Sequence, residues 1–379
     1  MRAMNGPRVL RGVVILVSLL LGLALGGSAS AKSRTLTMVP LVEHWNGSTW
    51  TELQIARPGG QLDQLDTVVA PSATSVWAFG WTRFAQRWDG TAWQRVALPV
   101  PKGSQSPEFH AAAAVSPNNI WAVGDVELPG SAPPAHAVID HWNGHHWRMV
   151  RSSAPAGYSQ LLGVTALSAK DVWAVGTAAG GTLTIHWNGK TWKRIASPNP
   201  TTPSTPARSS GGTLNAVAGH SSHDVWAVGQ HYVVDADGNH ALHPLVLHWN
   251  GRRWKAVSSP DPSGPAHRSF FYGVAAPSAT GVWAVGSAAR NGVQHALAER
   301  WDGTRWRIVP AHGNPLGGVS ALTANDVWAA GGETGGSVTH WNGSAWTIQT
   351  RLDYNDALGA VVEVSPTNVW AVGVRLVSS

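Results

Sequence analysis

The sequence predicts an all-β fold, a seven-bladed β-propeller with four antiparallel strands in each blade. Two short motifs carry this prediction: W-[ND]-G-x-x-W occurs seven times, [VI]-W-A-x-G also occurs seven times, and the two alternate strictly along the chain. Successive copies of the second motif are 42 to 57 residues apart, with no helical spacing of apolar residues between them. A period near that length is typical of blades built from four short strands.

Nearly all Trp residues belong to the repeat, because only Trp81 of the 22 Trp residues stands outside the two motifs. The first motif begins at Trp45, Trp88, Trp142, Trp187, Trp249, Trp301 and Trp341, and the second is centred on Trp77, Trp121, Trp173, Trp226, Trp283, Trp328 and Trp370. One buried indole removes about 150 to 250 Å² from water, which contributes roughly 4 to 6 kcal/mol of transfer free energy. We therefore interpret the repeated Trp residues as packing between blades.

Each repeat divides into four predicted strands, a to d. Strand a is small and apolar, as in residues 162–166, and an S-x-x-[DN] turn leads from it to strand b, the apolar V-W-A-V-G run. Strand c ends in H-W-N-G, where the Asn-Gly pair predicts a two-residue hairpin turn whose central residues both have positive φ. Strand d alternates apolar and basic residues, as in residues 192–196, which indicates an edge strand with one wet face.

Side-chain size predicts the order of the strands within a blade. The strands nearest the axis of a propeller converge, so the small residues of strand a place it innermost and the charged strand d outermost. The chain begins with strands c and d, in residues 42–55, and ends with strands a and b, in residues 358–376. The two termini should therefore complete the seventh blade together, which removes the open edge of the ring.

The N-terminal region has the layout of a secretory signal peptide. Arg2, Arg8 and Arg11 precede an apolar run over residues 13–25, and a small-residue site follows at residues 29–31. We expect residues 1–31 to be a signal peptide, residues 32–40 a short linker and residues 41–379 one propeller, secreted to the cell surface or beyond. The chain has no Cys, which excludes disulfides, thiolate metal sites and a cysteine nucleophile.

The alternation of VWAVG with HWNGxxW resembles the Trp-rich propeller repeats of secreted bacterial proteins, which are grouped with kelch and galactose-oxidase-type propellers. Tectonin-type lectins are more distantly similar, since they pair a VWxV strand with a WxGxxW hairpin, and that resemblance implies sugar binding. The Asp boxes of sialidases place an Asp, a Gly and an aromatic residue at a similar turn. Their spacing differs by one residue from that of residues 88–93.

The enzymatic interpretations of these resemblances find little support in the residues. Galactose oxidases need a Tyr cross-linked to a Cys, and this chain has no Cys. Sialidases need a nucleophilic Tyr, but none of the four Tyr residues, Tyr158, Tyr232, Tyr272 and Tyr354, lies in a matching motif. We favour a non-catalytic binding or scaffold role, with a carbohydrate-active hydrolase or lyase as the alternative and a structural surface or spore-coat protein also open.

The two functional classes differ in their need for acids at the mouth of the channel. A hydrolase would gather two or more carboxylates with perturbed pKa values there. The acids of the predicted variable face are sparse and dispersed over several blades, which favours binding; they are Glu108, Asp125, Glu127, Asp235, Asp237, Asp261 and Glu333.

Histidine and calcium-type motifs give weak signals for a metal. Five of the 17 His residues belong to the H-W-N-G copies, but Arg87 and Arg300 replace them in the other two copies, so we interpret this position as structural. Asp235, Asp237 and Asn239 surround a Gly as in a calcium loop, without the downstream Glu of an EF-hand. We expect no cofactor, with calcium at these three residues as the weak alternative.

All long insertions fall in the b–c and d–a connections, which lie on one face of an up-and-down propeller. Variable loops on a rigid scaffold can form a binding surface, although Pro- and Gly-rich insertions are also merely tolerated. The residues on this face that exceed the repeat pattern are the predicted ligand contacts: Trp81, Tyr232, His267, Arg268, Phe270 and Tyr272. We expect a monomer that binds a glycan or a protein, with no nucleic acid and no membrane contact beyond the signal peptide.

Overall fold

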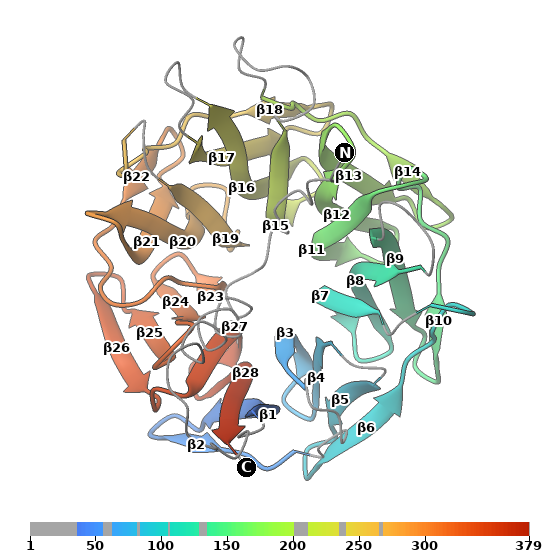
Figure 1. Cartoon of the computed structure of the whole chain (residues 1–379), viewed down its shortest axis with the longest axis vertical. Helices are drawn as coiled ribbons and strands as arrows, with labels where there is room; N and C mark the ends of the chain where they lie inside the picture. The colour runs from blue at the N-terminus through green and yellow to red at the C-terminus, as the bar shows by residue number, and fades with distance from the viewer. Residues whose placement is uncertain are drawn as a thin grey trace, which may run out of the picture.

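The computed structural model describes residues 36–55, 63–81, 84–104, 107–128, 135–200, 211–234, 240–264 and 268–378. In this part of the chain 28 strands form seven four-stranded antiparallel sheets, which stand side by side around a ring (Figure 1). The described residues contain no helix. The predicted seven-bladed propeller with four antiparallel strands per blade is confirmed.

Each blade uses its strands in the predicted order from the axis outward (Figure 1). Strands a are β3 (Leu65–Ser72), β7 (Glu108–Ser116), β11 (Ser159–Ser168), β15 (Gly212–Ser221), β19 (Ser269–Ala275), β23 (Gly318–Thr323) and β27 (Asp356–Ser365). Strands b are β4 (Ser75–Gly80), β8 (Asn119–Glu127), β12 (Asp171–Ala178), β16 (Asp224–Val234), β20 (Val282–Arg290), β24 (Asp326–Gly331) and β28 (Asn368–Ser378).

The outer strands complete the blades. Strands c are β1 (Leu36–Trp45), β5 (Phe84–Trp88), β9 (Ala135–Trp142), β13 (Gly181–Trp187), β17 (His240–Trp249), β21 (Val293–Trp301) and β25 (Ser337–Trp341). Strands d are β2 (Trp50–Glu52), β6 (Trp93–Ala97), β10 (Trp147–Met149), β14 (Trp192–Arg194), β18 (Trp254–Ala256), β22 (Trp306–Ile308) and β26 (Trp346–Arg351). We number the blades 1 to 6 from β3–β6 to β23–β26; blade 7 combines β27 and β28 with β1 and β2.

The ring closes in blade 7, as the sequence predicted. Strand β1 pairs with β28 along its whole length, from Leu36 opposite Ser378 to Trp45 opposite Val369. The first strand therefore begins within residues 32–40, which the sequence analysis assigned to a linker, because β28 extends far enough to pair with residues 36–40.

An arginine links three strands of this closing blade. Arg375 on β28 donates through Nε and Nη2 to the two carboxylate oxygens of Asp356 on β27, at 2.7 and 2.8 Å. Its Nη1 donates to Glu52 Oε1 on β2, at 2.9 Å. A bidentate guanidinium contact of this kind fixes geometry as well as charge, so it ties both ends of the chain together.

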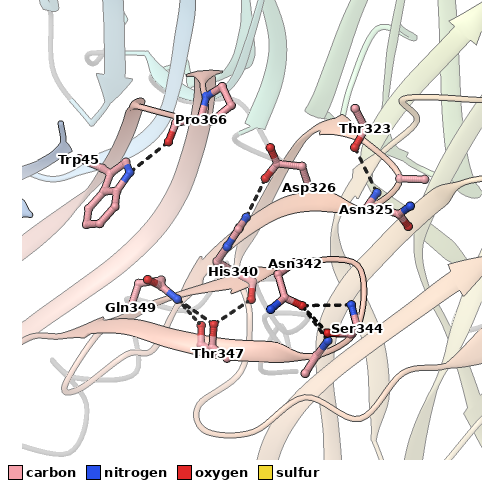
Figure 2. A network of polar contacts seen from close by, with 12 residues as sticks. Trp45, Thr323, Asn325, Asp326, His340, Asn342, Ser344, Thr347, Gln349 and Pro366 are labelled. Carbon is pink, nitrogen blue, oxygen red and sulfur yellow. Dashed lines mark hydrogen bonds and ion pairs between the residues drawn. The ribbon is translucent and has the colours of Figure 1, made fainter. Parts of the chain in front are cut away.

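The c–d hairpins differ from the predicted two-residue turn. In blade 6, Trp341 and Trp346 are direct partners, so four residues form the connection. Asn342 Oδ1 accepts hydrogen bonds from the backbone N–H groups of Ser344 and Ala345, at 3.0 and 3.1 Å (Figure 2). Only Gly343 has a positive φ, of 93°. The Asn therefore shapes the turn with its side chain, and an Asp does the same in blades 1 and 5.

The repeated histidine stacks inside its own blade. His340 Nε2 lies 2.7 Å from Asp326 Oδ1 (Figure 2), and its ring lies 4.3 Å from that of Trp328. Five blades repeat the polar contact: His44–Asn368, His141–Asn119, His186–Asp171, His248–Asp224 and His340–Asp326. The structural interpretation of these histidines agrees with the contacts.

Two blades replace the histidine by arginine and change its partner at the same time. Arg87 lies over Trp77 at 5.3 Å where strand b begins with Ser75, and Arg300 lies over Trp283 at 5.6 Å where the equivalent residue is Gly281. A cation above an indole face is attracted by the ring quadrupole. The contact with the Trp is thus kept while the polar partner is lost.

Neighbouring blades pack through indoles. Trp226 of blade 4 is 1% exposed and meets Trp301 and Trp306 of blade 5, with ring centroids 4.9 and 5.4 Å apart. The equivalent contacts join Trp77 to Trp142 and Trp147, Trp121 to Trp187 and Trp192, Trp173 to Trp249 and Trp254, Trp283 to Trp341 and Trp346, Trp328 to Trp45 and Trp50, and Trp370 to Trp88 and Trp93. The predicted role of the repeated Trp residues is confirmed.

We predict that Trp226→Ala lowers the free energy of unfolding by roughly 3 to 5 kcal/mol, because it leaves a cavity between two blades. Urea denaturation followed by circular dichroism would measure this loss. Tyr354→Ala, at a side chain that is 76% exposed, is the control and should change stability by less than about 0.5 kcal/mol. Equal stability of the two variants would contradict the packing role of Trp226.

Four carboxyl groups are buried within the ring and carry raised pKa values, with burial as the largest cause. The pKa is raised to about 7 for Glu43 and Asp140 and to about 8 for Glu299 and Glu363. Glu299 is fully buried and accepts a hydrogen bond of 2.8 Å from Ser259, in the connection that follows the preceding blade's strand d. These groups are therefore neutral in the folded protein at pH values where the unfolded chain ionises them.

This burial predicts that stability falls between pH 6.5 and 8.5. The unfolded state binds fewer protons than the folded state in this window, so the free energy of unfolding decreases as pH rises. Glu299 alone should account for a loss on the order of 1 to 2 kcal/mol. Glu299→Gln should flatten the slope in urea titrations at pH 6.5, 7.5 and 8.5.

The matched control for that measurement is Asp89→Asn. Hydrogen bonds from Ala92 and Thr91 lower the pKa of Asp89 to about 2, so it is ionised throughout the window, and five other blades carry Asn at this position. If Asp89→Asn changed the pH dependence of the free energy of unfolding as much as Glu299→Gln, that dependence could not be assigned to the buried carboxyl groups.

Candidate functional site

The two faces of the ring differ in how they are built. The antiparallel order within each blade places the a–b and c–d turns on one face and the b–c and d–a connections on the other. We call the second face the mouth face; strands a begin there and strands b end there. Some residues that the sequence predicts on this face lie outside the described residues: the calcium candidates Asp235, Asp237 and Asn239, and the ligand contact His267.

A β-bulge recurs near the mouth end of strand a. In six blades the a–b register shifts by one residue directly after the pair that contains the motif Gly, as between Phe109 opposite Gly124 and Ala111 opposite Val123. The extra residues are Asp66, His110, Leu162, Asn215, Tyr272 and Gly359. A bulge re-aims side chains and leaves one residue outside the regular pairing, so this position is free to differ between blades.

A close approach of two backbone segments explains the Gly that all seven copies of the [VI]-W-A-x-G motif carry. A Cβ atom on Gly229 would lie 2.0 Å from the backbone oxygen of Thr213 on the neighbouring strand a. The equivalent distances are 1.8 to 2.1 Å in all seven blades. The carbonyl of strand a thus approaches strand b so closely that only Gly fits, and the motif records this approach in the sequence.

Gly229→Ala should therefore lower the free energy of unfolding by about 2 to 3 kcal/mol, because overpacked backbone must shift to admit the methyl group. Chemical denaturation would measure the loss. Gly359→Ala is the control, since its Cβ would meet only the Asp66 oxygen, at 3.8 Å, and it should be close to neutral. An equal effect of the two substitutions would refute the close-approach argument.

In blade 2 the bulge gathers three ionisable side chains. Glu108 and Asp125 are direct partners across β7 and β8, and His110 Nε2 lies 2.8 Å from Asp125 Oδ1. One ligand atom from each of the three residues lies within 4.8 Å of the others. Within the described part of the chain, this is the one group of three His, Asp or Glu residues with such spacing. We call it the blade 2 triad.

The adjacent blade holds the triad from the side. Gln160 on β11 donates through Nε2 to Asp125 Oδ1, at 3.1 Å, and Tyr158 donates its hydroxyl proton to Gln160 Oε1, at 2.8 Å. The side chains of Asp125 and His110 are only 5% and 12% exposed. The carboxylate of Asp125 is therefore fixed by partners from two blades.

The triad carries an excess of negative charge. Burial is the largest cause of the raised pKa of Glu108, and the charges of Asp125, Asp66 and Glu127 raise it further, while His110 lowers it. Burial also raises the pKa of Tyr158, with Asp125 as the second cause. This part of the mouth therefore attracts cations and protons.

The same two positions carry other chemistry elsewhere in the ring. In blade 4, the bulge residue Asn215 donates to Gln230 Oε1 at 3.4 Å and to the backbone oxygen of Phe271 in blade 5 at 2.7 Å. Asn215 is fully buried. A neutral amide pair thus fills the positions of His110 and Asp125, so the fold itself does not require charges there.

The predicted aromatic contacts occupy equivalent places in other blades. Phe270 and Tyr272 stand where blade 2 has Glu108 and His110, and their rings form an edge contact at 4.9 Å. Trp81 follows the motif Gly of blade 1, as Asp125 follows that of blade 2. All three side chains are partly buried, and the structure brings only Phe270 and Tyr272 into contact with each other.

The other predicted contacts surround a second polar group in blades 4 and 5. Arg268 is exposed, and its backbone pairs with Leu242. Nearby, His243 bonds to Asp261, and Asp261 Oδ1 accepts from Ser269 at 2.8 Å. Tyr232 is partly buried on β16, directly opposite Leu242. The role of these predicted residues in ligand binding stays a prediction.

Sequence analysis missed the blade 2 triad. The prediction that the acids of this face are dispersed is wrong for Glu108 and Asp125, because pairing of β7 with β8 sets them directly opposite each other. His110 was not singled out, because it lies outside the H-W-N-G copies. Aligning the residue after each motif Gly with the first residues of strand a would have been the signal, since only blade 2 carries ionisable side chains at all three positions.

No helix in the described part of the chain is long and apolar enough to span a membrane. The predicted signal peptide, residues 1–31, lies outside that part.

A scan against protein-family models finds no match, and a search of curated proteins finds none. Solved structures match well. "YCF48 bound to D1 peptide" aligns with a TM-score of 0.53 and 15% identity, over 83% of this chain and 94% of that chain. YCF48 from Cyanidioschyzon merolae gives a TM-score of 0.54 and 15% identity over the same shares.

A WD40 protein gives a similar match. The WD40 repeats of RRP9 align with a TM-score of 0.54 and 10% identity, over 84% of this chain and 96% of that chain. Identities this low establish the fold alone, and the resemblance to kelch and galactose-oxidase-type propellers stays a prediction. The chain shares the seven-bladed propeller fold of the YCF48 and WD40 structures.

Proposed function

We propose that this chain is a non-catalytic binding propeller that captures a segment of another protein at its mouth face, outside the cell or at its surface. The observation that carries the proposal is the contrast between the two faces. The opposite face repeats one set of turns and His contacts around the ring, whereas the bulge positions at the mouth hold a different side chain in nearly every blade.

The side chains at the mouth suit a polypeptide that carries basic and apolar groups. The blade 2 triad and its acidic neighbours would attract a Lys or Arg side chain, and the Phe270–Tyr272 pair offers an aromatic surface. Another propeller of this fold, YCF48, has been solved with a D1 peptide bound. The signal-peptide layout of residues 1–31 supports the extracellular location.

The ligand class can be tested with peptide and glycan arrays probed by the purified chain. We expect retention on peptides with basic residues, and we expect Tyr272→Ala and Trp81→Ala to weaken it at least tenfold without changing the melting temperature. Lys170→Ala and Lys190→Ala, in exposed turns of the opposite face, are the matched controls and should bind as the parent chain does.

Each outcome of the array experiment is informative. Retention on glycans that depends on Trp81 and Tyr272 would replace the protein ligand by a sugar at the same face. If Lys170→Ala and Lys190→Ala reduced retention as much as Tyr272→Ala and Trp81→Ala, the assignment of binding to the mouth face would be overturned.

A carbohydrate-active hydrolase or lyase is the second candidate, and the pairing of Glu108 with Asp125 favours it. Two carboxyl groups this close, one with a raised pKa, fit the acid and nucleophile of a retaining glycosidase. Release of reducing ends from polysaccharides, abolished by Glu108→Gln, would support this candidate, and its absence across a substrate panel would leave binding as the function.

A further inference from the structure

We propose that Glu108, His110 and Asp125 form a binding site for a divalent transition-metal ion of the Zn²⁺ or Mn²⁺ type. The donor set is one imidazole and two carboxylates. Imidazole suits transition metals, and carboxylates suit Mn²⁺ and also bind Zn²⁺. The inference does not need the proposed protein ligand, but a bound ion and a basic side chain of that ligand would compete for the same two carboxylates.

The positions of the three donors fit one ion. Ligands bound at about 2.0 to 2.2 Å around a tetrahedral ion lie roughly 3.3 Å from one another. In the structure His110 Nε2 and Asp125 Oδ1 are 2.8 Å apart, and all three donors lie within 4.8 Å of one another. Small side-chain rotations are enough to place an ion between them, and the β7–β8 pairing keeps the backbone fixed.

In the structure, a hydrogen bond joins the two ligand atoms between which the ion would bind. The contact between His110 Nε2 and Asp125 Oδ1 requires a proton between the two atoms. An ion that took its place would bind Nε2 of the neutral imidazole and the carboxylate. The Nε2 proton would then move to Nδ1 of a neutral ring, or would leave a charged ring for solvent. Metal binding should therefore compete with protonation.

Asp125 has the supporting contacts that metal ligands commonly have. Gln160 donates to its Oδ1 from the next blade, and Tyr158 fixes Gln160 in turn. Outer partners of this kind orient a ligand, and their loss typically weakens metal binding 10- to 100-fold. Gln160 and Tyr158 are thus positioning residues of the proposed site.

Blade 4 shows that the triad is not needed to build a blade. There Thr213, Asn215 and Gln230 stand in place of Glu108, His110 and Asp125, and the amides bond to each other and to the next blade. Burying charge is costly unless a counter-charge or metal compensates it. The triad sets two carboxylates against one imidazole, so a bound cation would offset the remaining negative charge.

The test is calorimetric titration of the untagged chain with ZnCl₂ and with MnCl₂ at pH 7.5. We expect one ion per chain for at least one of the two metals, and no comparable binding of MgCl₂. The triple variant Glu108→Thr, His110→Asn and Asp125→Gln copies blade 4 and should keep the circular dichroism spectrum while weakening binding at least 100-fold.

Two further variants separate this site from incidental histidine binding. His186→Arg removes a His–Asp contact of the same 2.8 Å length on the opposite face, copies the residue that two blades carry there, and should leave the affinity unchanged. Gln160→Leu should weaken binding 10- to 100-fold. For the parent chain, affinity should fall as pH drops from 7.5 to 5.5, because protons compete with the ion for the ligand atoms.

Three results would overturn the proposal: absence of binding by either metal at submillimolar concentration, undiminished binding by the triple variant, or an equal loss in His186→Arg. Peptide capture by a chain that binds no metal would leave the proposed function in place and remove only the metal site.

Discussion

The structure depends on the contact between one indole of each blade and two indoles of the next. The strand b Trp lies between its own blade's His or Arg and the adjoining W-x₄-W hairpin, so a single residue joins the packing within a blade to the packing between blades. Because every interface uses the same three rings, the curvature repeats around the circle. Blade 7 meets blade 1 through Trp370, Trp88 and Trp93. Pairing of β1 with β28 completes blade 7 and so removes the open edge of the ring.

The sequence was sufficient to predict this architecture because the residues that enforce it recur with fixed spacing. Trp, the motif Gly and the Asn or Asp of the hairpin all act through local chemistry. The turn type was wrong because Asn-Gly serves two geometries: Asn can adopt a positive φ, or it can accept backbone hydrogen bonds through its side chain. Asn342 does the second, and only the length of the connection, which depends on pairing of the two Trp residues, separates the alternatives.

The site was harder to predict because it is a product of register. Glu108 and Asp125 lie on different strands, and nothing local in the sequence states that they are partners. The bulge makes the prediction harder still. It inserts one residue into strand a, and this insertion changes which side chains lie on the same face of the sheet. Tyr272 and Trp81 were singled out because they exceed the repeat pattern. His110 was overlooked and Asp125 was named only among the dispersed acids, because charged residues near loops are ordinary.

The bulge and the Gly opposite it also explain how a strongly repetitive scaffold can carry varied chemistry. The close approach of the two backbones leaves no freedom at the Gly. Three positions beside it differ between blades: the bulge residue of strand a, the residue after the Gly, and the strand a partner of that residue. Blade 4 fills them with an amide pair, blade 5 with two aromatic rings and blade 2 with two acids and an imidazole. The indole contacts with the next blade are the same in all three blades, so the mouth can vary without disturbing the contacts that hold the ring. The buried carboxyl groups within the ring differ from these mouth positions. Their ionisation lowers the stability of the fold, and they are not among the side chains that vary at the mouth.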